Sequence, residues 1–230
     1  MQHLIVATRN ARKTREIQRI LGPRFAVRDL SDHPQIPETM ESGKTFEENA
    51  VLKATAASKE LPGLVIADDS GLEVYALDGA PGIYSARYAG QNASDKQNID
   101  KLLSDLLRKG VWHNFASCDS GAGQVANLRH FASGRFCCVI ALAHEGELLG
   151  TFEGTVEGTI VERASGSHGF GYDPIFVPNG FGQTFAELPA EVKNRISHRT
   201  QATRALAAKL AALKLSDQGL GGGGGGAPGC

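Results

Sequence analysis

Short apolar runs alternate with amphipathic stretches along most of this 230-residue chain, which predicts an α/β fold. After the first run, Ile17, Ile20 and Leu21 recur at helical spacing, so the chain opens as strand, loop and helix. Runs rich in β-branched and aromatic residues indicate further strands. The strands predicted in this way are residues 4–8, 25–30, 64–67, 72–77, 136–143, 148–157 and 175–177.

Capping residues and apolar stripes predict three more helices. Thr45 is a good N-cap, and Glu48 follows three residues later, which is the capping-box pattern. Apolar side chains at 46, 50, 54, 57 and 61 form one stripe, so we expect a helix over about 46–60. Residues 94–107 also have a helical pattern, and Ser197 can cap a last helix with leucines at 206, 210 and 213.

The order of these elements predicts one domain over residues 1–215 with a mixed sheet. Glu145 and Gly146 can turn a hairpin between two of the strands. Residues 109–134 have no periodicity and are interpreted as an inserted loop. Eight of the 28 glycines lie in residues 216–230, which we interpret as a flexible tail. We expect deletion of this tail to leave turnover unchanged.

Composition and charge exclude several function classes. Lys and Arg total 24 against 25 Asp and Glu, whereas a general binder of nucleic acid or membrane surfaces is usually basic. The longest apolar run, residues 137–143, is far shorter than the ~20 residues of a membrane helix. The four cysteines lack metal-ligand spacing and are expected to be free thiols. These features predict a cytoplasmic protein without a nucleic-acid or membrane partner.

Asp68 and Asp69 are the first candidates for chemistry. They follow an apolar run, and ligands of open α/β sheets bind at the carboxyl ends of strands. Two carboxylates together suit Mg²⁺, which prefers oxygen ligands and often shares them with substrate phosphates. Gly71 would let the chain turn sharply away. The alternative is that the two acids only cap a turn.

Basic residues beside predicted helices could bind anions. The loop over residues 8–13 joins the first strand to the first helix and includes Lys13, although it is not a P-loop. Lys53 lies on the apolar side of its predicted helix, where it either extends to the surface or points into a cleft. Lys193, His198 and Arg199 cluster near the last helix and could bind phosphate or a base. Ordinary solvated surfaces remain the alternative for each group.

A loop with three glycines near residue 170 could bind a planar ring. Phe170 and Tyr172 flank Gly171 there, and either ring could stack on a nucleotide base. Aromatic side chains in such loops can equally close the edge of the core.

Taken together, these segments closely resemble the inosine triphosphatase-like family of non-canonical purine nucleoside triphosphate pyrophosphatases, specifically the bacterial dITP/XTP pyrophosphatase type. The resemblance covers about four-fifths of the chain and leaves out only residues 109–134 and the tail. It is carried by residues 8–13 (TRNARK), 41–49 (ESGKTFEEN), 67–72 (ADDSGL), 79–87 (GAPGIYSAR), 169–174 (GFGYDP) and 197–199 (SHR).

The resemblance implies an elongated mixed β-sheet with flanking helices, forming two lobes around a central cleft. It also implies Mg²⁺-dependent hydrolysis of ITP, XTP and dITP to the nucleoside monophosphate and pyrophosphate, by a cytoplasmic homodimer. Glu41 and Asp69 would bind Mg²⁺. Asp69 would also activate water, and Asp68 would support the same site. Lys53 would neutralise charge on the departing pyrophosphate. The substrate-binding residues implied are Thr8, Arg9, Asn10, Ala11, Arg12, Lys13, Ser70, Phe170, Gly171, Tyr172, Asp173, Lys193, His198 and Arg199.

Base selection and two rival functions remain to be separated. Arg199 or a backbone amide could donate to the 6-keto oxygen of a deaminated purine, whereas the amino group of adenine would be left unpaired at a cost of about 1–3 kcal/mol. One rival is a pyrophosphatase for other modified nucleotides on a similar fold. The other is a non-catalytic nucleotide-binding regulator, although such a protein has no need of Glu41 and Asp69.

Overall fold

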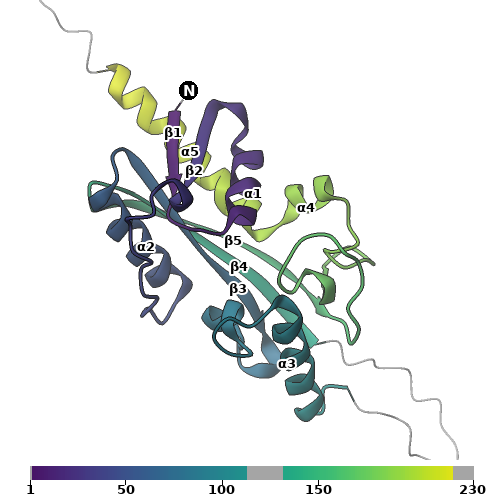
Figure 1. Ribbon diagram of the computed structural model, residues 1–230. Coiled ribbons are helices and arrows are strands. Elements are labelled where there is room, and N and C mark those ends of the chain that lie inside the picture. The colour runs from purple at the N-terminus through teal and green to yellow at the C-terminus, as the bar shows by residue number, and fades with distance from the viewer. Residues whose placement is uncertain (1, 113–131, 220–230) are drawn as a thin grey trace, which may run out of the picture.

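The computed structural model describes residues 2–112 and 132–219, and within them the strands form one six-stranded sheet (Figure 1). The strands lie in the order β2-β1-β3-β4-β5-β6. They are β1 (Gln2–Val6), β2 (Phe25–Asp29), β3 (Leu64–Val74), β4 (Ala132–His144), β5 (Glu147–Ile160) and β6 (Phe176–Pro178). The α-helices are α1 (Ala11–Leu21), α2 (Phe46–Glu60), α3 (Asp95–Arg108), α4 (Ala190–Ile196) and α5 (His198–Gly219).

The sheet is mixed, as predicted. β1 runs parallel to β2 and β3, whereas β4, β5 and β6 are each antiparallel to the strand before them in the sheet. The predicted hairpin joins β4 to β5 through Glu145 and Gly146. Both residues have positive φ angles, of 50° and 84°, which a two-residue hairpin turn requires.

The separation of residues 64–67 and 72–77 into two strands was wrong. β3 is continuous because β4 pairs with every residue from Leu64 to Val74. Gly71 therefore lies inside a strand instead of making a turn. A Cβ at Gly71 would lie 2.4 Å from Ser85 Oγ and 2.5 Å from Gly82 O, so glycine is needed there for close packing.

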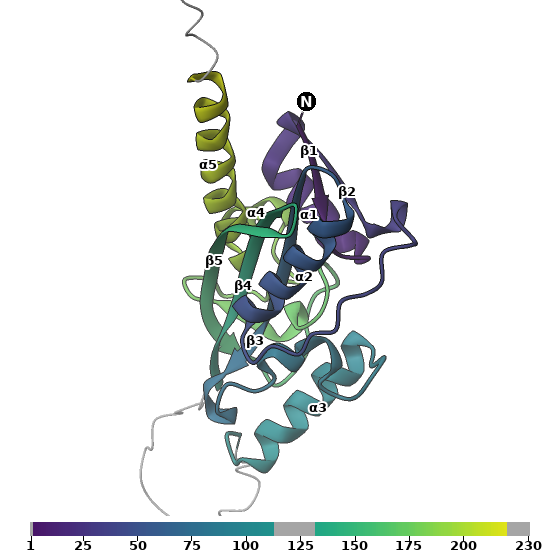
Figure 2. The same cartoon turned by 90° about the vertical axis from the view of Figure 1, so that its left-hand side faces the viewer.

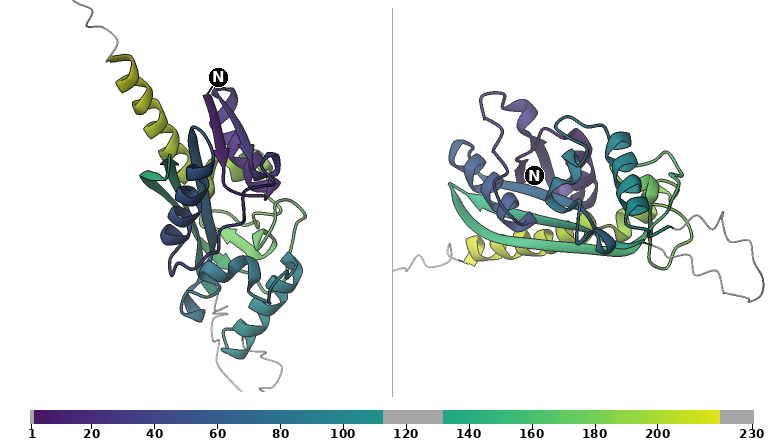
Figure 3. Two further views of the ribbon diagram at one scale, coloured as in Figure 1. Left: turned by 60° about the vertical axis from the view of Figure 1, so that its left-hand side comes forward. Right: turned by 90° about the horizontal axis from the view of Figure 1, so that it is seen from below.

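Helices cover both faces of the long strands and form the two lobes. α2 packs on one face and α5 on the other, with α1 beside α5 (Figure 3). The fully buried side chains of Ile17, Leu206 and Ile140 belong to the core on the α5 side. α3 lies at the opposite end of the sheet from β1 and β2 (Figure 2), around a separate core that includes Leu72 and Leu102. The molecule is therefore elongated, with a lobe at each end of the long strands.

Local signals explain where the helices begin. Thr45 Oγ1 accepts the N–H of Glu48 at 3.1 Å, which confirms the predicted cap of α2. The capping box is only half formed, because the Glu48 carboxylate accepts the N–H of Lys44 instead of that of Thr45. Ser197 caps α5 as predicted, with its Oγ accepting the N–H of Thr200. The short α4 was not predicted from the sequence.

The two irregular regions differ from their predicted bounds. β4 begins at Ala132, so the last three residues of the predicted insertion belong to the sheet. Most of the remainder, residues 113–131, lies outside the described residues. α5 extends to Gly219, so the first four residues of the predicted tail are helical, and residues 220–230 also lie outside the described part.

Candidate functional site

Two carboxylates and one lysine form the centre of the candidate site. Asp69 comes from β3, Lys53 from α2 and Glu41 from the loop before α2. Lys53 Nζ lies 2.8 Å from Asp69 Oδ1 and 3.0 Å from Glu41 Oε1. The lysine side chain is only 13% exposed. Of the two alternatives left by the sequence, Lys53 therefore points into the site and does not extend to the surface.

The surroundings give the two carboxylates different proton affinities. Burial raises the pKa of Asp69, and the charge of Lys53 offsets this only in part. Burial also acts on Glu41, but Lys53 and Arg87 outweigh it and lower the pKa of that carboxyl. A carboxylate with a raised pKa is the better proton acceptor near neutral pH. Asp69 is therefore the candidate general base.

Asn49 orients Asp69 from the buried face of α2. Its Nδ2 donates to Asp69 Oδ2 at 3.3 Å, and its Oδ1 accepts the N–H of Gly43 at 2.9 Å. The side chain is fully buried, so both bonds replace contacts with water. Asn49 was not among the predicted site residues. The available signal was a polar residue on the same helix face as Phe46 and Lys53.

Asp68 faces the other side of β3, because neighbouring side chains in a strand point in opposite directions. The expectation of a carboxylate pair at a strand end is corrected accordingly. Asp68 Oδ1 lies 2.8 Å from Lys13 Nζ, and its Oδ2 lies 3.2 Å from Arg199 Nη2. Burial would raise the pKa of Asp68, but Lys13 and Arg199 outweigh it and hold the pKa far below the usual range. Asp68 thus anchors two cations and does not face Glu41.

The amino end of α1 places Lys13 beside the cleft. Asn10 caps the helix, with its Oδ1 accepting the N–H groups of Arg12 at 3.0 Å and Lys13 at 3.4 Å. Thr8 Oγ1 in turn accepts the N–H of Asn10 at 3.1 Å. Ala11 is the first helical residue, so residues 11–13 belong to the helix and not to the predicted loop. The positive charge of Lys13 at the amino end of this helix suits a phosphate.

Arg9 and Arg12 already have partners in the protein. Arg9 donates to the carbonyl oxygens of Leu30 at 2.8 Å and Ile36 at 2.7 Å, and so ties the first loop to the chain after β2. Arg12 Nη1 lies 3.3 Å from Asp95 Oδ2. That contact joins α1 to α3.

The glycine loop separates its two aromatic residues. Tyr172 is 3% exposed and donates its hydroxyl to Ser85 O at 2.9 Å, so its ring packs in the core and is not available for stacking. Phe170 is half-buried, and the cations of Arg12, Lys193 and Arg199 lie 5.2–6.0 Å from its ring centroid. Phe170 is therefore the candidate stacking residue.

Three buried basic residues close the far side of the cleft. Arg199 donates to Asp68, to Ser70 Oγ at 2.9 Å and to Glu16 at 2.5 Å. Lys193 Nζ lies 2.5 Å from Asp173 Oδ2. Burial, together with the charges of Arg199 and Lys193, lowers the pKa of His198 well below its usual value. His198 is therefore neutral at physiological pH.

The basic groups and Phe170 line a cavity of about 160 Å³ between the two lobes, whereas Glu41, Lys53 and Asp69 lie outside its lining. Its lining comes from α1, β3, β4, α3, α4, α5, the glycine loop and the 3₁₀ helix η4 (Gly82–Arg87). His198 Nδ1 is buried without a hydrogen-bond partner among the described residues, and His198 lines this cavity. The predicted site residues in the lining are Asn10, Lys13, Ser70, Phe170, Gly171, Tyr172, Asp173, Lys193, His198 and Arg199.

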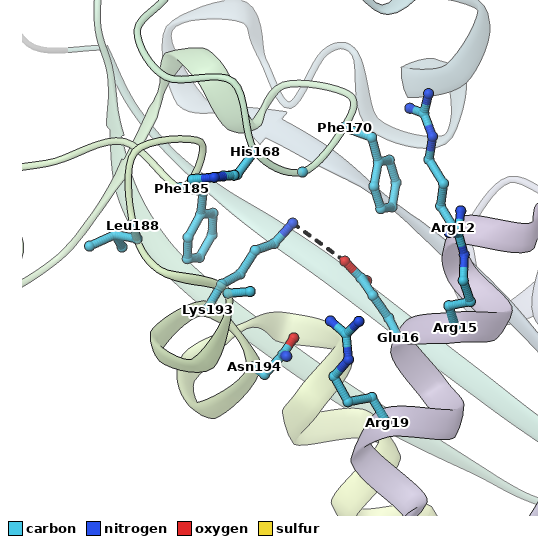
Figure 4. A pocket seen from close by; sticks show the side chains of 12 residues that line it. Arg12, Arg15, Glu16, Arg19, His168, Phe170, Phe185, Leu188, Lys193 and Asn194 are labelled. Carbon is cyan, nitrogen blue, oxygen red and sulfur yellow. Dashed lines mark ion pairs between the residues drawn. The ribbon is translucent and has the colours of Figure 1, made fainter.

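A second cavity of about 270 Å³ lies beside the first and shares Phe170 and Lys193 with it (Figure 4). Three arginines of α1, at positions 12, 15 and 19, line one wall. Glu16 is the acidic residue in this lining, and it lies 3.5 Å from Lys193 Nζ. Positive charge therefore surrounds the approach to the cleft.

Two further charged residues of the site, Arg87 and Glu16, were not predicted from the sequence. Arg87 Nη1 lies 2.6 Å from Glu41 Oε2, and Glu16 holds Arg199 and Lys193. Arg87 ends the 79–87 segment that carries the resemblance, which was the available signal. Glu16 lies one helical turn after Lys13, but its partners are 177 and 183 residues further along the chain. No local pattern could reveal that pairing.

No group of three or more His, Cys, Asp or Glu side chains is arranged to hold a metal ion within the described residues. Glu41 and Asp69 are two carboxylates around one cation, the Lys53 ammonium. Two carboxylates suffice for Mg²⁺ when phosphates complete its coordination, so the residues fit that ion. None of the described helices is long and apolar enough to cross a membrane.

Comparison with known sequences identifies close relatives. A sequence model of the Ham1 family matches residues 4–209, a range that includes every residue placed around the cleft. A dITP/XTP pyrophosphatase from Shouchella clausii is 47% identical over 206 residues, or 90% of this chain and 95% of that protein. A dITP/XTP pyrophosphatase from Bacillus subtilis is 43% identical over 213 residues, or 92% and 98% of the two chains.

Solved structures show the same fold. The Ham1 protein of Staphylococcus aureus superposes with a TM-score of 0.74 at 40% identity, over 92% of this chain and all of that one. The nucleoside-triphosphatase, or dITP/XTP pyrophosphatase, of Mycobacterium abscessus gives a TM-score of 0.65 at 37% identity, over 91% and 99%. The elongated two-lobed architecture is thus shared with these proteins.

Proposed function

The chain belongs to the Ham1 family, and from this premise we propose that it hydrolyses deaminated purine nucleoside triphosphates, such as ITP, XTP and dITP, to the monophosphate and pyrophosphate. The observation that carries the proposal is the group of Glu41, Lys53 and Asp69 beside a cavity lined by Lys13. Carboxylates for a metal and ammonium groups for phosphates are what cleavage of a phosphoanhydride requires.

Asp69 serves as the general base in the proposed reaction. A water molecule attacks the α-phosphorus, its proton passes to an Asp69 oxygen, and the bond from the α-phosphorus to the bridging oxygen breaks. That oxygen leaves with the pyrophosphate. Asn49 fixes the orientation of the Asp69 carboxylate for the proton transfer. Lys53, next to Asp69, stabilises negative charge on the departing group.

Mg²⁺ is the proposed cofactor, held by Glu41 and Asp69. When bound, it neutralises charge on the phosphate oxygens and polarises the bond that breaks. The amino end of α1 contributes Thr8, Asn10 and Lys13 to the phosphates. Arg9, Ala11 and Arg12 support this segment, since Arg9 and Arg12 are engaged with the protein itself.

In this proposal Phe170 stacks on the base, and residues around Lys193 form hydrogen bonds with the edge of the base. The nitrogens of Arg199 already contact Asp68, Glu16 and Ser70, so we place His198 Nδ1 opposite the 6-keto oxygen instead. A neutral imidazole with a buried, unpartnered nitrogen can donate a hydrogen bond there. The amino group of adenine would face this donor with another donor.

The test is pyrophosphate release by the purified protein with Mg²⁺. We expect turnover of ITP, XTP and dITP, and much lower rates with ATP, GTP, CTP and dTTP. Asp69→Asn should reduce kcat by about 10²–10⁴-fold, because loss of a general base costs that much. Asp100→Asn, a surface carboxylate paired with Lys96, is the control and should keep full activity.

The outcome separates the rival functions. Preference for pyrimidine or methylated nucleotides would indicate the related pyrophosphatase, and nucleotide binding without turnover would indicate a regulator. Equal rates with ATP and ITP would contradict the proposed base selection. We also propose a homodimer and a cytoplasmic location, by analogy with the family, and light scattering of the purified protein tests the dimer.

A further inference from the structure

Arg87 holds the oxygen of Glu41 that Lys53 leaves free. Lys53 Nζ lies 3.0 Å from Glu41 Oε1, and Arg87 Nη1 lies 2.6 Å from Glu41 Oε2. Both oxygens of this carboxylate therefore contact a protein cation. A divalent ion that uses Glu41 as a ligand must compete with at least one of these cations.

The guanidinium of Arg87 retains donors for a second partner. Among the described residues, only its Nη1 forms a hydrogen bond. Nε and Nη2 remain, in the planar arrangement that matches two oxygens of a phosphate. The side chain as a whole is 28% exposed.

Arg87 is the last residue of η4, which is held in place in the wall of the 160 Å³ cavity. Ser85 and Ala86 of η4 line that cavity. Ser85 Oγ fastens η4 to β3 by accepting the N–H of Leu72 at 2.9 Å and donating to Gly82 O at 2.6 Å. The Arg87 side chain can therefore change partner without movement of η4.

We propose that Arg87 is a catalytic residue that exchanges partners. Without substrate, it occupies Glu41 Oε2 and competes with the metal for that carboxylate. When the nucleotide and its metal bind, Arg87 moves to oxygens of the β- and γ-phosphates and stabilises the charge that builds up on the departing pyrophosphate. The inference rests on the proposed pyrophosphatase activity. It assigns the Arg87 guanidinium as a further cation that stabilises the departing pyrophosphate.

Metal binding by the nucleotide-free protein gives the first test. Titration with Mn²⁺, followed by its paramagnetic resonance signal, measures affinity without turnover. Arg87→Met removes the competing cation, so we expect up to about fivefold tighter Mn²⁺ binding, the usual range for one partly exposed ion pair. If Arg87 only positioned Glu41 for the metal, the same variant would bind Mn²⁺ more weakly. That result would overturn the proposal.

Kinetics with Mg²⁺ and dITP give the second test. We expect Arg87→Met to lower kcat about 10²-fold, as for loss of one donor to transition-state charge, and to weaken inhibition by pyrophosphate. Unchanged kcat or unchanged pyrophosphate inhibition would contradict the exchange. Arg87→Lys, which keeps the charge and is the second variant if the methionine protein does not fold, should recover part of kcat.

Arg135→Met is the matched control. Arg135 forms an ion pair of similar length, 2.7 Å, with Glu73 in the same sheet and outside the cavity. It should leave Mn²⁺ affinity and kcat unchanged. If the wild-type protein hydrolyses none of the nucleotides, the proposed function fails, whereas an active wild type with an unaffected Arg87→Met variant refutes only the present inference.

Discussion

Asp68 and Asp69 show how one position along a strand decides chemistry. They differ by one residue, yet Asp69 faces α2 with Lys53 and Asn49, and Asp68 faces Lys13 and Arg199. Burial acts on both carboxyls. The pKa of Asp68 falls because two cations outweigh that burial, whereas the pKa of Asp69 stays raised. One acid is thus kept as a permanent anchor and the other as a proton acceptor.

His198 should make stability depend on pH. Its pKa in the folded protein is well below 6.5, mainly through burial, with further lowering by Arg199 and Lys193. The unfolded chain therefore takes up a proton first as the pH falls. The stabilising contribution is present above pH ~6.5 and is lost at lower pH, by at most about 1.4 kcal/mol per pH unit for one proton. His198→Gln should remove this component.

Urea unfolding between pH 7.5 and 5.5 measures the effect. The wild-type free energy of unfolding should fall more steeply with decreasing pH than that of His198→Gln. His3→Gln, which changes an exposed histidine, is the control and should retain the wild-type slope. Equal slopes for the wild type and the His198 variant would show that this residue is not a buried neutral imidazole.

Sequence patterns identified most of the side chains at the site. They did not indicate which of these side chains contact one another. The motifs led to Lys53 and Asp69, which form an ion pair, and to Phe170, which lines the cavity. The sequence made Tyr172 an equal candidate for stacking. In the structure its hydroxyl instead donates a hydrogen bond to Ser85 O. Burial of a ring depends on segments distant in the sequence, and these leave no trace in the local pattern.

At the scale of elements, continuity of β3 is the main feature that the sequence obscured. Two acids, a serine and a glycine are typical of a turn, and isolated propensities favour a break there. The chain nevertheless stays extended, because the backbone of β4 pairs with all eleven residues of β3. Regular hydrogen bonding of buried backbone outweighs local turn preference. The same strand can therefore carry site residues on both faces.

Gly71→Ala tests the contact between β3 and η4. The added Cβ would lie within 2.5 Å of Ser85 Oγ and Gly82 O, so η4 must shift away from the strand. We expect a loss of about 1–3 kcal/mol in unfolding free energy, as for other overpacked sites. Turnover should fall as well, because η4 carries Arg87.

Thermal unfolding and dITP turnover check both effects. Gly182→Ala provides the control, since a Cβ at Gly182 would meet no atom within 4 Å. It should match the wild type in both measurements. A Gly71→Ala protein with wild-type stability would mean that η4 is not held against β3 as tightly as these distances imply.

At the scale of the whole molecule, charge is balanced in total but uneven in position. The formal net charge is −1, and composition alone gives no reason to expect an anionic ligand. The fold nevertheless brings Arg12, Arg15 and Arg19 to the side of the cavity beyond Phe170 (Figure 4). A local positive field of this kind attracts a triphosphate and raises its rate of association. The position of the arginines in the fold, and not the overall composition, therefore indicates an anionic ligand.

Reversal of two of these charges should slow substrate capture. Arg15→Glu with Arg19→Glu changes the charge beside the cavity by four units, and neither side chain is among the proposed substrate contacts. We expect kcat/KM for dITP to fall about threefold to tenfold at low ionic strength, with kcat unchanged. The deficit should shrink as salt is added, because exposed charges are screened within about 10 Å at 0.1 M.

The matched control is Arg24→Glu with Arg28→Glu. Both residues are exposed, the change in net charge is the same, and neither lines the two cavities. This variant should lose much less kcat/KM at low salt. An equal loss in both double variants would assign the effect to net charge, and a loss that persists at high salt would point to direct contact with the nucleotide. Only a deficit confined to the α1 variant and removed by salt fits attraction by the arginines beside the cleft.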